Sequence, residues 1–228
     1  MATSPEPPEN PERPGNPDPA QDPASVASVH ADLADRYAAL PDGGGRAVGV
    51  RLLERWAEPH RRYHTVAHLR FVLARLDELA GVADDPVAVE LAAWFHDAVY
   101  DPRAADNEER SAELAETLLP ESPRRPEVAR LVRLTAGHHP AEGDADGAAL
   151  CDADLAVLAG SPDEYASYAA AVRVEYGHVS DADFAVGRAR VLRQLLALPR
   201  LFHTAHGAGR WAGTARFNLR GELSLLTG

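Results

Sequence analysis

The chain has 228 residues, of which 45% are hydrophobic and 25% charged, enough for one well-packed core or at most two small ones. Acidic residues outnumber basic ones by 35 to 23, and the net charge of −12 argues against a broad nucleic-acid-binding surface. Every basic residue is an arginine, which excludes Schiff-base and P-loop lysine chemistry. A single cysteine, Cys151, excludes an intramolecular disulfide and a CxxC zinc site.

No segment approaches the ~18 uninterrupted apolar residues of a membrane span, and the N-terminus lacks the apolar stretch of a signal peptide. We therefore expect a cytoplasmic protein with neither a membrane nor a nucleic acid as a partner. The sequence indicates no particular oligomeric state.

The first 23 residues contain eight of the 18 prolines, five acidic residues, one arginine and no aromatic residue. Such a segment buries too little apolar surface to offset the entropy lost on ordering. Residues 1–24 are therefore predicted to form a disordered tail, and residues 25–228 a single domain. The stretches 42–45 and 142–147, rich in Gly and Asp, are predicted to be loops within that domain.

Beyond the tail, apolar residues recur at three- and four-residue steps and strand-like alternation is absent, which predicts an all-α fold, an irregular helical bundle. The predicted helices cover about 63–80, 86–100, 107–119, 126–137, 148–159, 162–176, a segment that begins after Ser180, and 210–226. The helix from Pro86 is apolar on nearly all sides and is predicted to be buried at the centre. Asp106 and Glu109 have capping-box spacing, and His30 is expected at or before the start of the first helix.

Histidines and carboxylates gather at a few points of this pattern. His60, His64 and His68 stand four residues apart, which places them near one face of a helix if it begins near Pro59. The pair His96-Asp97 ends the most apolar helix, where unpaired polar groups would be costly. Imidazoles and carboxylates contributed by several helices are typical of a divalent transition-metal site. On an ideal helix, adjacent side chains diverge by ~100°, so an ion shared by this pair would lie over the groove between them.

Three stretches read Arg-Tyr-His-Thr-Val-Ala-His-Leu (62–69), Trp-Phe-His-Asp (94–97) and Cys-Asp-Ala-Asp-Leu (151–155). Together they resemble the H…HD…D signature of the HD superfamily of metal-dependent phosphohydrolases. The stretches 95–101, 106–112 and 172–176 resemble, more narrowly, a bacterial branch of predicted HD phosphohydrolases. The resemblance covers about residues 30–226.

Carried over position by position, the resemblance implies the metal ligands His68, His96, Asp97 and Asp154. Asp154 is preferred to Asp152 because a small apolar run follows it. The ion implied is one of Mn, Fe, Co, Ni or Zn, with a second ion allowed if His138 or His139 also binds.

The resemblance also implies that His64 is the general acid or a phosphate contact. Asp101, four residues after Asp97, would orient the attacking water if the helix continued that far, although Pro102 follows it. Without lysine, phosphate binding by side chains falls to arginine, and the candidates are Arg62, Arg173 and Arg188.

The expected activity is hydrolysis of a small phosphorylated molecule, with a nucleotide as the leading expectation by family analogy. The type of ester bond stays open. One alternative is an HD-type di-iron oxygenase, which needs a second metal; another is a non-catalytic binding or regulatory module that the ion only stabilises. Glu175 is also open to a purely structural role, as part of an interhelical ion pair.

Overall fold

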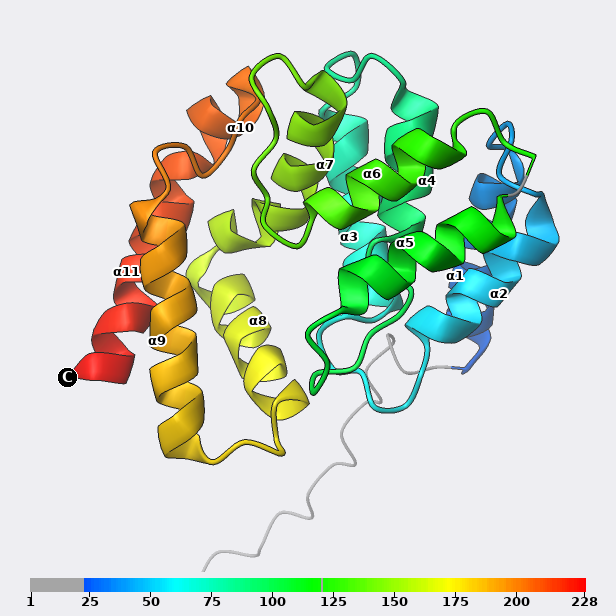
Figure 1. Cartoon of the computed structure of the whole chain (residues 1–228). Helices are drawn as coiled ribbons and strands as arrows, with labels where there is room; N and C mark the ends of the chain where they lie inside the picture. The colour runs from blue at the N-terminus through cyan, green and yellow to red at the C-terminus, as the bar shows by residue number, and fades with distance from the viewer. Residues whose placement is uncertain (1–22, 120) are drawn as a thin grey trace, which may run out of the picture.

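The helical periodicity of the sequence is realised throughout the described chain. The computed structural model describes residues 23–119 and 121–228, and every regular element in these two ranges is a helix, so the all-α prediction is confirmed (Figure 1). The elements are α1 (Pro23–Ala38), α2 (Arg46–Trp56), α3 (Val66–Glu78), α4 (Pro86–Phe95), α5 (Asn107–Leu118), α6 (Arg125–Leu134), α7 (Ala145–Leu155), the short 3-10 helix η2 (Ala156–Ala159), α8 (Pro162–Glu175), α9 (Asp181–Ala197), α10 (Ala205–Arg210) and α11 (Ala212–Thr227).

The predicted tail, residues 1–24, lies outside the described residues except for its last two, with which α1 begins. Within the described ranges, no helix is both long and apolar enough to cross a membrane.

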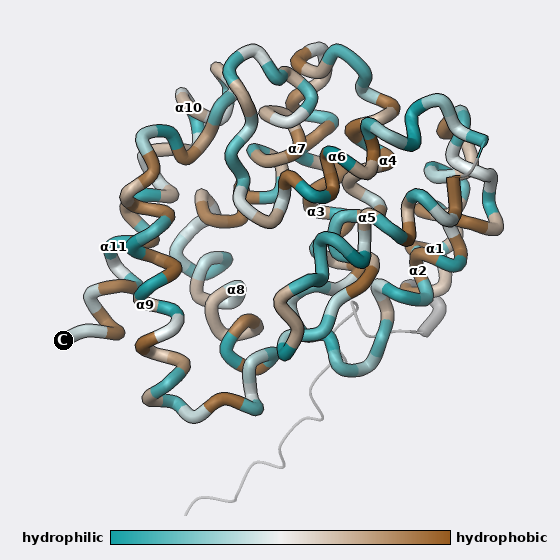
Figure 2. Tube along the Cα trace, viewed as in Figure 1, coloured by the Kyte–Doolittle hydropathy of each residue, from teal (hydrophilic) through white to brown (hydrophobic). Residues whose placement is uncertain are grey.

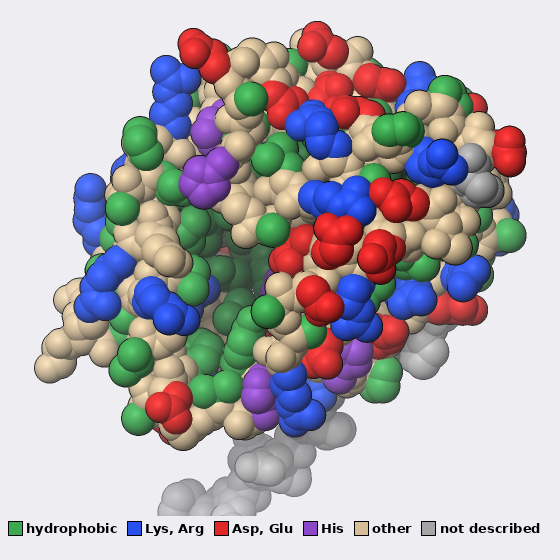
Figure 3. All heavy atoms as spheres, in the orientation of Figure 1, with side chains coloured by type: hydrophobic (Ala, Val, Ile, Leu, Met, Phe, Trp, Pro, Cys, Tyr) green, Lys and Arg blue, Asp and Glu red, His purple; other side chains and the backbone are tan. Residues whose placement is uncertain are grey.

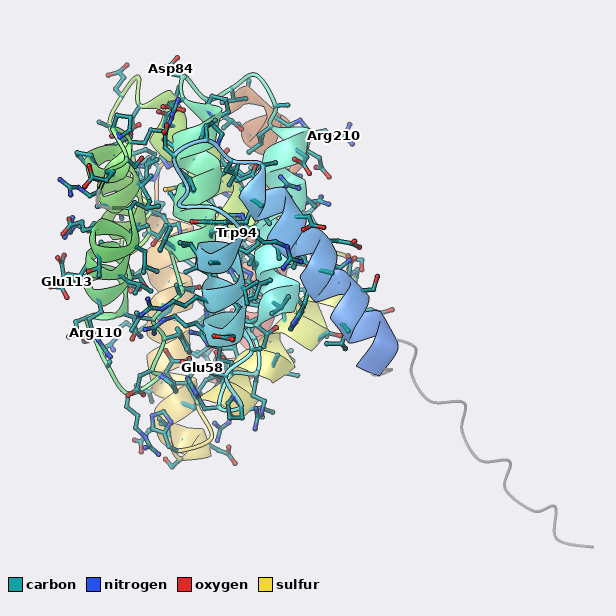
Figure 4. The ribbon with its side chains drawn as sticks, turned by 90° about the vertical axis from the view of Figure 1, so that its right-hand side faces the viewer. Glu58, Asp84, Trp94, Arg110, Glu113 and Arg210 are labelled. Carbon is teal, nitrogen blue, oxygen red and sulfur yellow. The ribbon has the colours of Figure 1, made fainter. Side chains whose placement is uncertain are left out.

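The centre of the bundle is α4, the helix whose sequence is apolar on nearly all sides. It begins with Pro86 after Asp85, whose carboxylate accepts the backbone N–H of Ala88, and it packs against α3, α5, α6 and α7. Trp94 and Phe95 are fully buried, and Figure 4 shows Trp94 in the middle of the helices. Burial on all sides explains why this helix needs no polar face.

The outer helices are amphipathic, because one side of each faces solvent. Figure 2 shows α5 as largely hydrophilic, and Figure 4 shows Arg110 and Glu113 on its outer side. Arg133 of α6 bridges to Glu109 and Glu116 of α5 at 2.7 and 2.9 Å, which joins the exposed faces of these two helices. Such exposed pairs contribute little stability each.

The C-terminal helices α8, α9 and α11 stand together on one side of the molecule, opposite α1 and α2 (Figure 1). The 3-10 helix η2 connects them to the central helices, since it follows α7 directly and packs against α8 and α11. Asn218 of α11 donates to the carbonyls of Leu158 and Gly160, at 2.9 Å each, and so fixes α11 to η2.

Two predicted helix boundaries near the histidines are wrong. Residues 59–65 are not helical, and α3 begins only at Val66, after the cap residue Thr65. The helix predicted to reach Tyr100 ends at Phe95. In both places a side chain that is distant in the sequence binds backbone groups that a longer helix would have paired: Glu175 before α3 and Arg61 after α4. The helical period of the sequence carries no information about such partners.

Other local predictions also need correction. His30 lies inside α1 rather than at its start, and α2 and α10 are helices that the sequence pattern did not predict. The Asp106 side chain makes no capping bond and lies 3.9 Å from the Arg110 guanidinium, while the Glu109 side chain is engaged by Arg133. The cap at Ser180 is confirmed, since its hydroxyl accepts the backbone N–H of Asp183.

Glycines 49 and 221 provide a matched test of the packing of α2. A Cβ on Gly49 would lie 2.8 Å from atoms of the buried Tyr37 side chain, whereas a Cβ on Gly221 of α11 would meet open space. Gly49→Ala should destabilise the protein by about 1–3 kcal/mol through overpacking. Gly221→Ala should stabilise it by about 0.5–1 kcal/mol, because alanine is the better helix former. Urea unfolding of the two variants checks this, and stabilisation by Gly49→Ala would contradict the packing described.

Candidate metal centre

Three helices that pack against one another bring four predicted ligands to one point. His68 lies on α3, His96 and Asp97 follow the last turn of α4, and Asp154 lies on α7. Both histidines are buried, Asp97 is 8% exposed, and the Asp154 side chain is 14% exposed. Because α3, α4 and α7 are in mutual contact, residues separated by up to 86 positions meet at one place.

The atoms that face one another are those that bind metals. The Nε2 atoms of His68 and His96 are within hydrogen-bond distance, 3.3 Å apart, so both are directed at the same point. Asp154 Oδ1 lies 3.1 Å from His68 Nε2 and 3.7 Å from His96 Nε2. Asp97 Oδ2 lies 3.2 Å from His96 Nε2 and 3.8 Å from His68 Nε2. His68, His96 and Asp154 form a group whose donor atoms are close enough to share one ion.

The divergence expected for adjacent residues on a helix does not keep His96 and Asp97 apart. Since α4 ends at Phe95, the backbone turns at this point, and the Ala98 N–H bonds to the Phe95 carbonyl three residues back. The two side chains therefore approach each other directly instead of pointing to different faces of a helix.

The environment of the two histidines fits a metal. His96 Nδ1 donates to the Ala93 carbonyl at 2.8 Å, so Nε2 is the atom directed at the cluster, and its lone pair becomes available to a metal when its proton leaves. His68 Nδ1 is buried and has no hydrogen-bond partner among the described residues. Two imidazole nitrogens and two carboxylates are a donor set suited to Mn, Fe, Co, Ni or Zn. The residues present therefore fit the ion that the sequence predicts, although they do not identify it.

The charges of the cluster also favour a cation. Burial lowers the pKa of His96, but the carboxylates of Asp97 and Asp154 outweigh it and raise that pKa to about 9. Burial raises the pKa values of Asp97 and Asp154, and the neighbouring histidines, His96 first, more than reverse this and keep both acids ionised. Burial lowers the pKa of His68. The two ionised carboxylates thus favour a positive charge between them, and a divalent ion could provide that charge.

His64 lies beside the cluster, held by Glu175 at the end of α8. Its Nδ1 donates to Glu175 Oε2 at 2.6 Å, its Nε2 is 3.9 Å from Asp97 Oδ2, and its side chain is 21% exposed. Burial lowers the pKa of His64, but Asp97 and Glu175 more than compensate, so the net shift is upward. The protonated ring is therefore favoured at this position.

Glu175 is the residue whose importance the sequence did not reveal. Its side chain is fully buried and accepts the backbone N–H groups of Arg62, Tyr63 and His64 at 2.9, 3.2 and 3.3 Å, as well as the Tyr100 hydroxyl. These bonds replace those of the missing first turns of the predicted helix. Its place in the stretch 172–176, which carries part of the family resemblance, was the only available signal.

Arg61 is a second residue that the sequence did not single out. It is 3% exposed and donates to the carbonyls of His64, Asp97 and Ala98 at 3.0, 2.8 and 3.2 Å. It therefore joins the loop before α3 to the turn after α4. Its position next to the His64 motif was the only sequence signal for this role.

The structure distinguishes Asp152 from Asp154 and His138 from His139. Asp152 points away from the cluster and accepts the backbone N–H groups of His203 and Thr204 at 2.7 and 2.9 Å. His138 donates to Asp154 Oδ2 at 2.8 Å and adopts a left-handed backbone conformation, with φ of 54°, which is uncommon for a residue other than glycine. His139 is exposed.

Several predicted site residues lie elsewhere. Asp101 is exposed and its carboxylate accepts the Arg103 N–H; the helix that was to place it over Asp97 ends six residues earlier. Arg62 is exposed and bonds to local backbone carbonyls, and Arg173 pairs with Asp181 at 2.6 Å.

A cavity of about 720 Å³ opens beside the cluster. Asp154, His138 and His64 contribute to its wall, and so does Arg188, the one of the three candidate arginines that reaches it. Figure 3 shows a hollow with hydrophobic side chains on its floor and histidine side chains near its rim. Its volume is within the range of small-molecule sites.

No protein-family model, curated protein or solved structure matches this chain. The chemistry of the cluster and of its cavity is therefore the main support for any function.

The two acidic residues of α7 should respond differently to amidation. Asp154→Asn should weaken Mn²⁺ binding by more than about 100-fold, since loss of an outer partner of a ligand alone costs 10–100-fold. Asp152→Asn should keep the metal but lose about 1–3 kcal/mol of stability, because two buried N–H groups lose a charged acceptor. Calorimetric titration with Mn²⁺ and urea unfolding of both variants provide the measurement. The reverse assignment would follow if only Asp152→Asn lost the metal.

Glu175 should make the metal-free protein sensitive to acid. Burial raises its pKa, but His64 and the backbone N–H groups lower it to about 2, below the ~4.3 of an unfolded glutamate. The stabilisation is complete above that unfolded value and is lost as the pH falls toward 2. Glu175→Gln should therefore be less stable at pH 6 and lose less further stability between pH 5 and pH 3. Urea unfolding in chelator tests this, with the exposed Glu113→Gln expected to follow the wild type.

Proposed function

We propose that the protein is a metal-dependent phosphohydrolase of the HD type. The observation that carries the proposal is the convergence of His68, His96, Asp97 and Asp154 beside a cavity large enough for a small molecule, with Asp154 and the neighbouring His64 in the cavity wall. The sequence resemblance assigns the same four residues as ligands, and that assignment was made from motif positions alone. Geometry and motif therefore support the same site independently.

The chemistry of such a centre suits phosphate esters. A divalent ion held by His68, His96, Asp97 and Asp154 would lower the pKa of a water molecule toward ~7 and polarise a phosphoryl oxygen. The chain's own contribution is to hold the four donors in place, through Arg61 on the Asp97 carbonyl and the Ala93 carbonyl on His96. Fixed donors leave little reorganisation to be made during the reaction.

His64 is the proton donor in this proposal. Glu175 occupies its Nδ1, so Nε2 is the nitrogen that can deliver a proton, and the ring forms part of the cavity wall. The raised pKa of His64 favours the protonated ring before the reaction. The departing oxygen of a substrate in the cavity would take its proton from this atom.

One observation favours the second candidate, a two-metal centre such as that of a di-iron oxygenase. His138 reaches Asp154 Oδ2 while Asp154 Oδ1 faces the histidine pair, so the carboxylate has a nitrogen partner on each side. A carboxylate in that position is able to bridge two ions. Two irons per chain would favour this candidate, whereas one ion per chain would favour the phosphohydrolase.

The substrate that we propose is a small phosphorylated molecule. The expectation of a nucleotide comes from the family resemblance, and the cavity volume is sufficient for one. Arg188 is the arginine placed to face it.

Two variants separate metal binding from proton donation. Asp97→Ala should lose both the metal and hydrolysis, because a ligand is removed. His64→Gln should keep the metal while kcat falls by about 10²–10⁴-fold, the usual contribution of a general acid. The measurement is phosphate and pyrophosphate release from a panel of phosphomonoesters and nucleotides with Mn²⁺, together with metal content and far-UV circular dichroism.

The control is Arg62→Gln. It should match the wild type, because Arg62 is exposed and its guanidinium lies outside the cavity. Wild-type protein that binds Mn²⁺ but hydrolyses no member of the panel would contradict the proposal. If chelation of that protein then lowered Tm, the ion would have a structural role only.

A further inference from the structure

The cavity beside the metal centre continues into a second one. The second cavity has a volume of about 450 Å³ and shares Tyr63, His64, Tyr168, Arg188 and Val191 with the first. His64 therefore stands where the two cavities meet, next to Asp97. A molecule whose reacting group lies at the metal centre has space for its remaining part along α9.

Much of the wall of the first cavity is apolar. Leu155, Val157 and Leu158 line it from the end of α7 and from η2, and Val191, Leu195 and Leu198 line it from α9 and the residue after it. Val191 is 41% exposed although it is a large aliphatic side chain. Apolar surface in a concave wall favours an apolar ligand, since it is removed from water when the ligand binds.

The same wall offers little positive charge. Arg188 is the one arginine among the described residues that line the first cavity, and its guanidinium is bound by Glu222 at 2.7 and 2.9 Å and by the Tyr168 hydroxyl at 3.1 Å. His138 is engaged by Asp154. His139 also lines the first cavity, and the second cavity adds Arg190 together with the carboxylate of Asp183. A chain of several phosphates needs several cations, whereas the two cavities offer two arginines, of which Arg188 is already compensated by Glu222.

We propose that the substrate is a phosphomonoester with a single phosphoryl group and an uncharged, apolar organic group that lies against η2 and α9. This inference rests on the proposed phosphohydrolase function. The oxygen of water bonds to phosphorus while the bond from phosphorus to the ester oxygen breaks, and its electron pair stays on that oxygen. The proton of His64 completes an apolar alcohol, and inorganic phosphate is the other product. The proton that the attacking water loses passes to the solvent, from which His64 is protonated again.

A series of alkyl phosphates tests the inference with the intact, Mn²⁺-loaded protein. Each buried methylene should raise kcat/KM about fourfold. Removal of about three or four methylenes from water corresponds to a preference for octyl phosphate over methyl phosphate of about 100-fold. AMP and ATP should fall below octyl phosphate. A series without any rise, or a preference for ATP, would overturn the inference while leaving the hydrolytic function in place.

A charge on the wall should remove the preference. Val191→Glu should lower the ratio of octyl to methyl phosphate kcat/KM by about tenfold or more, because a carboxylate replaces an apolar contact. The matched control is Phe217→Glu on α11, which is 72% exposed and outside both cavities. It should keep the wild-type ratio. Equal ratios in the two variants would place the alkyl chain elsewhere and overturn the inference.

Binding of a non-hydrolysable ligand separates this inference from the function on which it rests. Octylphosphonate should bind at least about tenfold more tightly than methylphosphonate by calorimetry, and Val191→Glu should abolish that difference. Tight binding by a protein that hydrolyses no ester would support the apolar site and contradict the phosphohydrolase. Equal binding of the two phosphonates would overturn the apolar site, whatever the hydrolysis assays show.

Discussion

The candidate centre depends on one buried carboxylate, that of Glu175. The loop before α3 runs through residues 59–65 without helical hydrogen bonds, and three of its consecutive backbone N–H groups converge on this side chain. Buried backbone donors need acceptors, and here α8 provides the acceptor from more than 100 positions away. Because the same carboxylate also holds His64 and Tyr100, it fixes the loop before α3, the turn after α4 and the end of α8 relative to one another.

Arg61 complements the buried negative charge of Glu175 with a buried positive charge. Its guanidinium contacts carbonyl groups of both segments that carry the histidines, and it lies 5.5 Å from the ring centres of Trp56 and Tyr100. Burial lowers the pKa of Arg61, yet the Glu58 carboxylate offsets part of this effect. A buried arginine that binds several backbone carbonyls fixes two irregular segments. In a helix, backbone hydrogen bonds would have the same effect.

The position of the cleft follows from the way the helices are grouped. The candidate ligands belong to α3, the end of α4 and α7, whereas the apolar wall belongs to the last residue of α7, to η2 and to α9, and α9 lies with the C-terminal helices. A site between two groups of helices can combine a polar, rigid side with an apolar side of different chemistry. That combination is the physical basis for assigning metal chemistry to one side and recognition of an apolar group to the other.

The sequence by itself determined the helical class, the buried centre at α4 and the residue types of the cluster, because these depend on local periodicity and on the cost of burying polar groups. It also favoured Asp154 over Asp152 through a motif, and the structure places Asp154 with the histidines. Only the tertiary structure decided that α4 ends at Phe95, that His64 precedes α3, and that Asp101, Arg62 and Arg173 lie away from the cavity. The turn after α4 and the loop that carries His64 depend on Arg61 and Glu175, whose partners are distant in the chain. Helical periodicity contains no information about distant partners.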